Sequence, residues 1–182
     1  QLMATLLGAR GKGDIAVWGV PMDFTASWRP GSRFASDSIK LVSHGLELYS
    51  PYFDRSLENV AFEDAGDAEL IWGNVSSSLE AIREQAEEIL NTGKYPNLAV
   101  VHFDAHTDLR ETFLGDKLSH ATVLRHVANE VGSKSLAQIG IRSGEREEFI
   151  WGHENTHFFP DREWEIIPAA KEVTKLFAGR PI

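Results

Sequence analysis

A short apolar run that leads directly into a cluster of polar residues constrains the fold of this chain most strongly. Leu98-Ala99-Val100-Val101 is unbroken and β-branched, which is typical of a strand buried on both faces of a parallel sheet. Asp104 would then lie at the carboxyl end of this strand, followed by His106 and Asp108. Open α/β sheets hold their ligand crevices at the carboxyl ends of strands. The sequence therefore predicts a parallel sheet whose chemistry begins at Asp104.

Two carboxylates and an imidazole at alternate positions are a suitable set of metal ligands. Oxygen from Asp104 and Asp108, with nitrogen from His106, suits a hard or borderline divalent ion such as Mn²⁺, Mg²⁺ or Zn²⁺. The chain has no cysteine that would favour a softer ion. From spacing alone, the same residues could equally cap a loop and hydrogen-bond its backbone, because short motifs often match by chance.

The rest of the chain alternates between apolar runs and amphipathic segments. Further strands are expected at 14–20, 59–64 and 136–142. Helices are expected after a cap at Ser36 or Asp37, over 75–90, from a cap at Ser119 to Gly132, and from Pro168 to Gly179. This alternation predicts a three-layer α/β/α sandwich with a parallel sheet, formed as a single domain by residues 1–182.

Other polar segments are interpreted as support rather than as ligands. Asp64-Ala65-Gly66-Asp67 is expected to be a structural turn whose carboxylates hydrogen-bond the backbone, with Gly66 supplying conformational freedom. The long loop that ends at Arg33 could be functional, but an ordered loop held by arginine-to-carboxylate contacts is the favoured interpretation. Residues Glu147 to Trp151 are expected to line the mouth of the site.

Composition narrows the possible partners. The chain has 182 residues, of which 42% are hydrophobic and 25% charged, as is ordinary for a soluble globular protein. Its net charge of −9 argues against a nucleic-acid partner and is compatible with a cationic substrate. No apolar run approaches the length of a membrane span, and the first seven residues are a poor signal peptide. We therefore expect a cytoplasmic protein with no membrane partner.

The segment from His102 to Asp108, together with Ser119-His120, resembles motifs of the ureohydrolase family of arginases and agmatinases. Other segments resemble motifs of the same family in the same order, and their sequences are most similar to those of agmatinases: Gly19–Asp23, Arg29–Arg33, Asp64–Asp67 and Gly140–Gly144. The resemblance covers nearly the whole chain. It implies the arginase-like fold.

The resemblance also implies a dinuclear Mn²⁺ site, with two ions per chain in the complete protein. Asp104 would bridge both ions, Asp108 would bind one and His106 the other, while His120 would be the active-site histidine. Two ions about 3.5–4 Å apart lower the pKa of a bridging water, and a nearby acid/base can then move the proton that the departing amine needs. No substrate-binding residue is identified.

The implied activity is hydrolysis of a small cationic guanidino compound, most simply agmatine to putrescine and urea in polyamine biosynthesis. Guanidinobutyrate or arginine are alternative substrates, and the family implies a homo-oligomer, either a trimer or a hexamer. A non-catalytic relative that serves as a binding or assembly subunit is a second hypothesis. A Mg²⁺ phosphatase with Asp104 as nucleophile ranks last, because His106 stands where that class needs a second aspartate.

Several motifs of the family do not occur in this sequence. The family also needs a histidine from a Gly-Gly-(Asp/Glu)-His turn, two aspartates from an Asp-x-Asp strand end, and a later acidic residue that holds the guanidinium group. Pro96 is followed directly by Asn97 where the family has a strand and that turn, and Gly179–Ile182 resembles the lead-in to the Asp-x-Asp strand. We expect the natural polypeptide to contain both missing segments, with a true deletion as the alternative.

Overall fold

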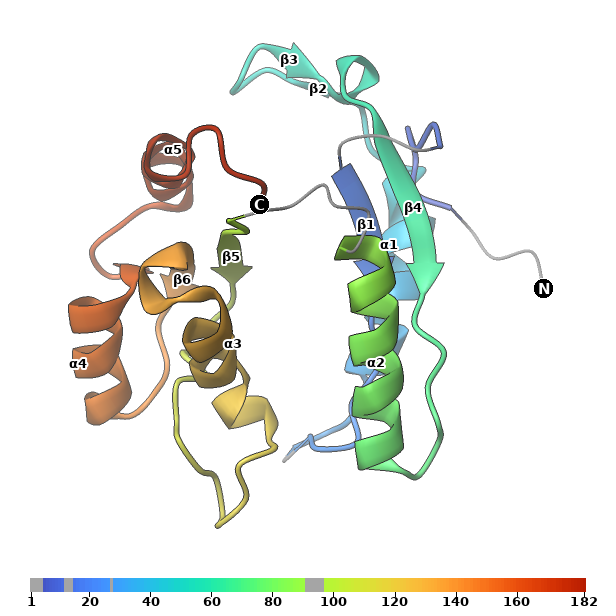
Figure 1. Ribbon diagram of the computed structural model, residues 1–182. Helices are drawn as coiled ribbons and strands as arrows, with labels where there is room; N and C mark the ends of the chain where they lie inside the picture. The colour runs from blue at the N-terminus through green and yellow to red at the C-terminus, as the bar shows by residue number, and fades with distance from the viewer. Residues whose placement is uncertain (1–4, 12–14, 27, 91–96) are drawn as a thin grey trace. The chain divides into compact units, whose positions relative to one another are not determined.

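The computed structural model describes residues 5–11, 15–26, 28–90 and 97–182, and the chain divides into two compact units, Gln1–Thr92 and Gly93–Ile182 (Figure 1). The first unit contains β1 (Ile15–Gly19), α1 (Ala35–Ser43), β2 (Tyr49–Ser50), β3 (Arg55–Ser56), β4 (Phe62–Asp67) and α2 (Val75–Leu90). The second contains β5 (Val100–Phe103), α3 (Val123–Val131), β6 (Leu136–Ile141), α4 (Arg146–Asn155), β7 (His157–Pro160) and α5 (Ile166–Leu176). The expected missing segment would follow Pro96, and residues 91–96 are outside the described residues.

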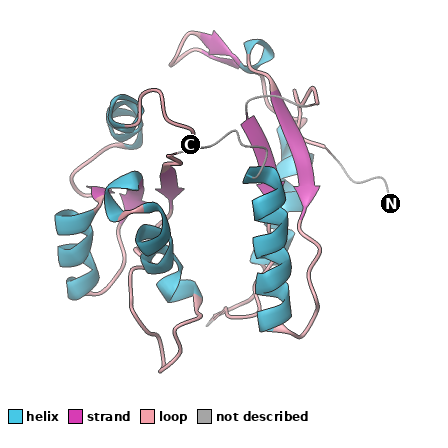
Figure 2. Cartoon of the chain, viewed as in Figure 1, coloured by secondary structure: helices cyan, strands magenta, loops and turns pink. Residues whose placement is uncertain are grey.

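The second unit is built on a parallel three-stranded sheet in the order β5-β6-β7, and helices pack around it (Figure 2). Successive side chains of β6 point to opposite faces, and an irregularity between Ile139 and Ile141 shifts this alternation by one residue. Ala137 and Ile139 pack in a cluster with residues of α5, whereas Leu136 and Ile141 pack with residues of α3. Helices therefore cover both faces of this sheet, which is the layering that the sequence predicts.

Helix α5 closes one of these faces. Its Val173 and its C-terminal neighbour Phe177 are buried against the sheet, while Leu176, which the sequence pattern groups with them, remains 41% exposed. Pro168 lies in the first turn of the helix, where its missing N–H costs nothing, and Gly179 follows the helix at a positive φ of 77°. The predicted boundaries of this helix are confirmed to within two or three residues.

The first unit pairs β1 with β4 in parallel and β2 with β3 as an antiparallel hairpin. Helix α1 begins at Ala35, directly after a 3₁₀ turn at Ser32–Phe34, and no side chain caps it. The predicted cap at Ser36 or Asp37 is therefore wrong. The reason is a tertiary contact, because the Ser36 hydroxyl donates a hydrogen bond to Asp67 of β4.

The apolar stripes of β1 and α1 are exposed in the first unit, although their sequence pattern predicts burial. Ile15 and Val17 of β1 are 48% and 38% exposed, and Ile39 and Val42 of α1 are 61% and 60% exposed. These side chains line a groove of about 620 Å³ that also includes Phe62. The described part of the chain provides no second layer over this face.

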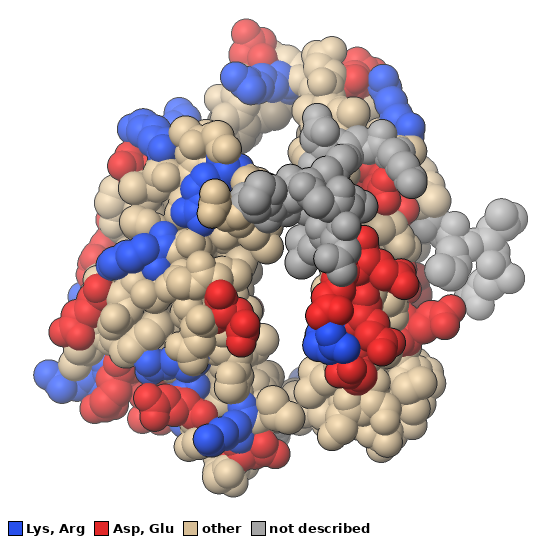
Figure 3. Space-filling view, viewed as in Figure 1, with Lys and Arg blue, Asp and Glu red and all other residues tan. Residues whose placement is uncertain are grey.

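Helix α2 carries a row of acidic side chains that are exposed to solvent. Figure 3 shows acidic side chains gathered over this helix. The guanidinium group of Arg83 pairs with both Glu80 and Glu87, and all three side chains are more than half exposed. Among the described residues, no helix combines the length and the apolarity that crossing a membrane requires.

Candidate metal centre

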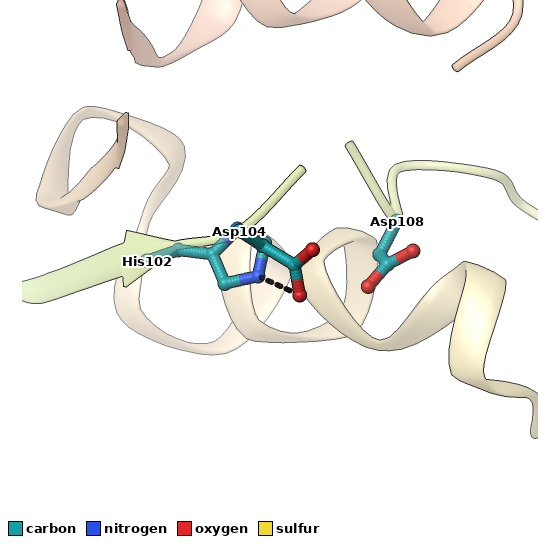
Figure 4. A group of neighbouring side chains, drawn as sticks. All are labelled: His102, Asp104 and Asp108. Atoms are coloured by element: carbon teal, nitrogen blue, oxygen red, sulfur yellow. Dashed lines mark ion pairs between the residues drawn. The ribbon is translucent and has the colours of Figure 1, made fainter. Parts of the chain in front are cut away.

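The polar cluster lies at the carboxyl end of β5, immediately after Phe103. His102, Asp104 and Asp108 each offer one ligand atom, and these atoms lie within 4.8 Å of one another (Figure 4). His102 lies on the strand itself, Asp104 is the first residue after it, and Asp108 lies in the loop beyond. The structure therefore brings together both of the carboxylates that the sequence identifies as candidate ligands.

The loop after Asp104 is held by the continuation of β6. Both Arg142 and Ser143 donate a backbone N–H to the carbonyl of Ala105, and Thr107 donates its own to the carbonyl of Ser143. Gly140 has a φ of +83°, and a Cβ atom there would lie 3.4 Å from the Asp104 carbonyl oxygen. Glycine at this position therefore lets β6 bend while the ligand-bearing chain passes close to it.

Glu148 of α4 holds the same loop from the interior of the unit and is only 5% exposed. One carboxylate oxygen accepts hydrogen bonds from the Thr107 hydroxyl at 2.6 Å and from the Leu109 N–H at 3.0 Å. The other oxygen accepts from the Glu145 N–H at 2.8 Å. The prediction that Glu147 to Trp151 line the mouth of the site is therefore wrong for Glu148. This residue supports the loop from the interior.

Gly144 allows this packing. A Cβ atom at position 144 would lie 2.6 Å from the Thr107 hydroxyl oxygen, which is closer than any real contact permits. The segment Gly140–Gly144, noted in the sequence for its resemblance to a family motif, therefore shapes the backbone around the ligand loop. It supplies no ligand itself.

Asp108 occupies an electrostatically unfavourable position. Burial and the neighbouring charge of Asp104 raise the pKa of the Asp108 carboxyl to about 6, although charges on His106 and His120 act in the opposite direction. Its backbone has a φ of +51°, and its carbonyl accepts a hydrogen bond from Leu124 of α3 at 3.0 Å. A cation between the two carboxylates would remove this repulsion.

Two imidazoles face the carboxylate of Asp104. Nδ1 of His106 lies 3.5 Å from Oδ1, and Nε2 of His102 lies 3.6 Å from Oδ2. His106 is well exposed, whereas His102 is half-buried and its pKa is lowered by that burial. Sequence reasoning identified His106 and overlooked His102, although its position two residues before Asp104 on a strand places both side chains on the same face.

The pKa of Asp104 is lowered despite its partial burial. Burial alone would raise the pKa, but the backbone N–H of His106, at 3.0 Å from Oδ1, and the nearby ring of His102 stabilise the carboxylate. As the pH falls, Asp108 therefore takes up a proton before Asp104 does. Oxygen donors of this kind, with an imidazole beside them, fit the preferences of Mn²⁺ or Mg²⁺.

His120 lies at the start of a 3₁₀ turn, His120–Thr122, that leads into α3. Ser119 caps this turn as predicted, because its hydroxyl accepts from the Ala121 N–H while its own N–H donates to the Thr122 hydroxyl. The His120 ring is exposed and contacts Phe113 edge-on. The charge of His120 acts to lower the pKa of Asp108, so this ring lies within electrostatic range of the centre.

Asp64 and Asp67 have a different partner. The ammonium group of Lys40 lies 3.3 Å from Asp64 and 2.9 Å from Asp67, and Lys40 is only 5% exposed. Asp64 also accepts a hydrogen bond from the N–H of Gly66 at 3.0 Å. Burial by itself would lower the pKa of Lys40, but the two carboxylates have the larger effect, so the pKa of Lys40 is raised. The predicted turn is wrong, because Asp64 to Asp67 form the end of strand β4. Asp64 does accept backbone N–H groups as expected, whereas the partners of Asp67 are the side chains of Ser36 and Lys40.

The long loop before α1 is held in the predicted manner. The guanidinium group of Arg33 lies 3.1 Å from the carboxylate of Asp23, whose side chain is almost fully buried. Trp28 extends into solvent with 79% of its surface exposed. The favoured interpretation, an ordered loop fixed by an arginine-to-carboxylate contact, is confirmed.

Comparison with known proteins identifies relatives that match most of this chain. The model of the arginase family matches residues 13–98 and 94–179 in two pieces that meet where the sequence analysis expects a missing segment. The chain is 43% identical to the agmatinase of Bacillus subtilis over 191 aligned positions, which include 93% of this chain and 65% of that protein. The chain thus spans just under two thirds of the length of this relative.

Solved structures agree with the sequence comparison. The agmatine ureohydrolase of Thermoplasma volcanium superposes with a TM-score of 0.71 at 26% identity, covering 96% of this chain and 68% of that one. A formiminoglutamase of Trypanosoma cruzi, solved with Mn²⁺, gives a TM-score of 0.68 at 15% identity, covering 91% and 66%. The predicted arginase-like α/β fold is confirmed.

Proposed function

Because this chain belongs to the arginase family, we propose that it acts as a Mn²⁺-dependent ureohydrolase, specifically an agmatinase that converts agmatine to putrescine and urea. The observation that carries the proposal is the pairing of Asp104 with Asp108 at the carboxyl end of β5. The similarity to agmatinases from Bacillus supports the choice of substrate. In this proposal both units belong to one arginase-like domain.

The metal would be held by Asp104, His106 and Asp108, with two Mn²⁺ ions in the complete protein. The donor set supports this assignment, because carboxylate oxygens and one imidazole suit such ions. The raised pKa of Asp108 supports it as well, since a bound cation favours the ionised carboxyl. When bound, Mn²⁺ would supply Lewis acidity and lower the pKa of a water molecule.

His120 is proposed to move the proton that the departing amine requires. The exposure of its ring and its electrostatic influence on Asp108 support this role, because a general acid must be accessible to the substrate and close to the reacting atoms. The net charge of −9 favours a small guanidino cation over a nucleic acid. A cytoplasmic homo-oligomer, a trimer or a hexamer, completes the proposal.

A urea-release screen tests the proposed activity. Purified protein is assayed with agmatine, guanidinobutyrate and arginine, with Mn²⁺ or after chelation, and metal content is measured in the same samples. We expect release of urea from agmatine only with Mn²⁺, and none from Asp104→Asn. Mn²⁺ binding without urea from any guanidino compound would favour the non-catalytic alternative, and urea release by metal-free protein would refute the metal mechanism.

A further inference from the structure

Gln138 is a completely buried amide in the middle of β6, next to the candidate metal centre. The parallel register places it directly opposite His102 of β5. Its Nε2 atom lies 2.7 Å from the carbonyl oxygen of Thr107 and 3.2 Å from Nδ1 of His102. Burying an amide costs free energy that an apolar side chain at the same position would not incur. These two contacts therefore point to a role beyond packing.

The contact with Thr107 determines which way the amide faces. A carbonyl oxygen can only accept hydrogen bonds, so the Gln138 atom 2.7 Å from it must be the N–H-bearing nitrogen. The reversed amide would set two oxygen atoms face to face. The second N–H of the same nitrogen is then available for Nδ1 of His102. Oε1 of Gln138 has no hydrogen-bond partner within the described part of the chain. This orientation therefore leaves one buried oxygen unpaired.

This orientation determines the tautomer of His102. A ring nitrogen that accepts a hydrogen bond carries no proton, so the proton of the neutral imidazole lies on Nε2. That nitrogen faces Oδ2 of Asp104 at 3.6 Å. A metal ion at Nε2 would require the proton to move to Nδ1, where it would point at an N–H of Gln138. His102 thus directs its Nε2–H toward Asp104, even though this ring lies within 4.8 Å of the ligand atoms of Asp104 and Asp108.

We propose that Gln138 is a positioning residue that holds His102 as a proton donor to Asp104 and keeps His102 out of the metal's ligand set. His106 then remains as the imidazole ligand. This inference rests on the proposed metal centre, which it deepens by deciding between two neighbouring histidines. Partners that orient a ligand in this way typically account for 10-fold to 100-fold in metal affinity.

The tautomer can be observed directly in the metal-free protein. Long-range ¹H–¹⁵N correlation spectra of ¹⁵N-labelled protein distinguish a protonated ring nitrogen from an unprotonated one. We expect His102 to carry its proton on Nε2 in the wild type and to lose this single tautomer in Gln138→Leu. A proton on Nδ1 in the wild type, or an unchanged tautomer in Gln138→Leu, would overturn the proposal. Neither result depends on urea release, so failure of the proposed function is recognised separately.

Mn²⁺ titration by calorimetry provides the second measurement. Gln138→Leu should bind Mn²⁺ about 10-fold to 100-fold more weakly, and so should His102→Leu. In contrast, His102→Gln, which keeps an N–H donor, should stay within about 3-fold of the wild type. Thr156→Val is the matched control, because it removes a buried hydrogen bond to the Gly152 carbonyl in the same unit. A loss in His102→Gln as large as in His102→Leu would show that His102 is a ligand and would refute the proposal.

Discussion

Replacing Asp108 with asparagine should stabilise the metal-free protein and abolish its response to Mn²⁺. The substitution removes a charge while leaving the backbone undisturbed, because asparagine tolerates the left-handed φ of +51° that Asp108 adopts. The carboxyl is costly in the absence of a cation, since burial and the charge of Asp104 both oppose its ionisation. The same change removes a proposed metal ligand, so stability and metal binding should move in opposite directions.

The magnitude follows from the pKa. A rise to about 6 from an ordinary value of about 3.9 corresponds to roughly 3 kcal/mol at about 1.4 kcal/mol per unit. Asp108 is partly exposed, so solvent screening reduces the effect to about 1 kcal/mol. Because the folded protein binds the proton more tightly than the unfolded chain, the destabilisation is complete above about pH 6 and disappears below about pH 4. The expected gain in melting temperature at pH 7.5 is about 2–4 °C.

Thermal melts of the wild type and Asp108→Asn, at pH 7.5 and pH 4, test this expectation. In the presence of chelator, the variant should melt higher at pH 7.5 and equally at pH 4. With Mn²⁺ at about 100 times its Kd, the wild type should gain about 2.7 kcal/mol and the variant nothing. Asp161→Asn, an exposed carboxylate in the same unit, is the control. A lower melting temperature for metal-free Asp108→Asn at pH 7.5, or a retained response to Mn²⁺, would contradict the reasoning.

Three further outcomes are expected. Asp104→Asn should lose both bound Mn²⁺ and urea release, whereas His120→Ala should keep the ions and have a lower kcat. Elemental analysis and steady-state kinetics measure these effects. Loss of the ions in His120→Ala would contradict its proposed role. Glu148→Ala removes three hydrogen bonds to a buried carboxylate. In a calorimetric titration it should weaken Mn²⁺ binding at least about 10-fold. An unchanged affinity would mean that the ligand loop holds its shape without Glu148. Lys40→Met should cost about 3–5 kcal/mol in urea denaturation, because two largely buried carboxylates lose their buried cation. Arg83→Met also removes a cation between two carboxylates, but at an exposed site, and should have no measurable effect.

The position of the candidate centre could be predicted from the sequence because the information is local. The apolar run that ends at Val101 specifies a strand, and a strand in a parallel sheet delivers the next polar residue, Asp104, to its carboxyl edge. The turn at Ser119 was predictable for the same reason, since a capping residue and its partner lie three positions apart.

The supporting contacts could not be predicted because they join distant parts of the chain. Glu148 reaches Thr107 across 41 positions, and Gln138 reaches His102 across 36. Ser36 was a reasonable helix cap until β4 placed Asp67 beside its hydroxyl. Local propensity cannot anticipate such partners, because the register of the strands decides them.

The anchoring of the ligand loop by Glu148 limits how this centre can be transplanted into another protein. A designer who copied only the seven residues from His102 to Asp108 would leave behind the carboxylate that accepts from Thr107 and Leu109. The graft would also lack the backbone of Ser143, which holds the loop at Ala105 and Thr107. The smallest portable module therefore comprises β5, β6 and α4 together, and a host scaffold must present two parallel strands and a following helix in this order.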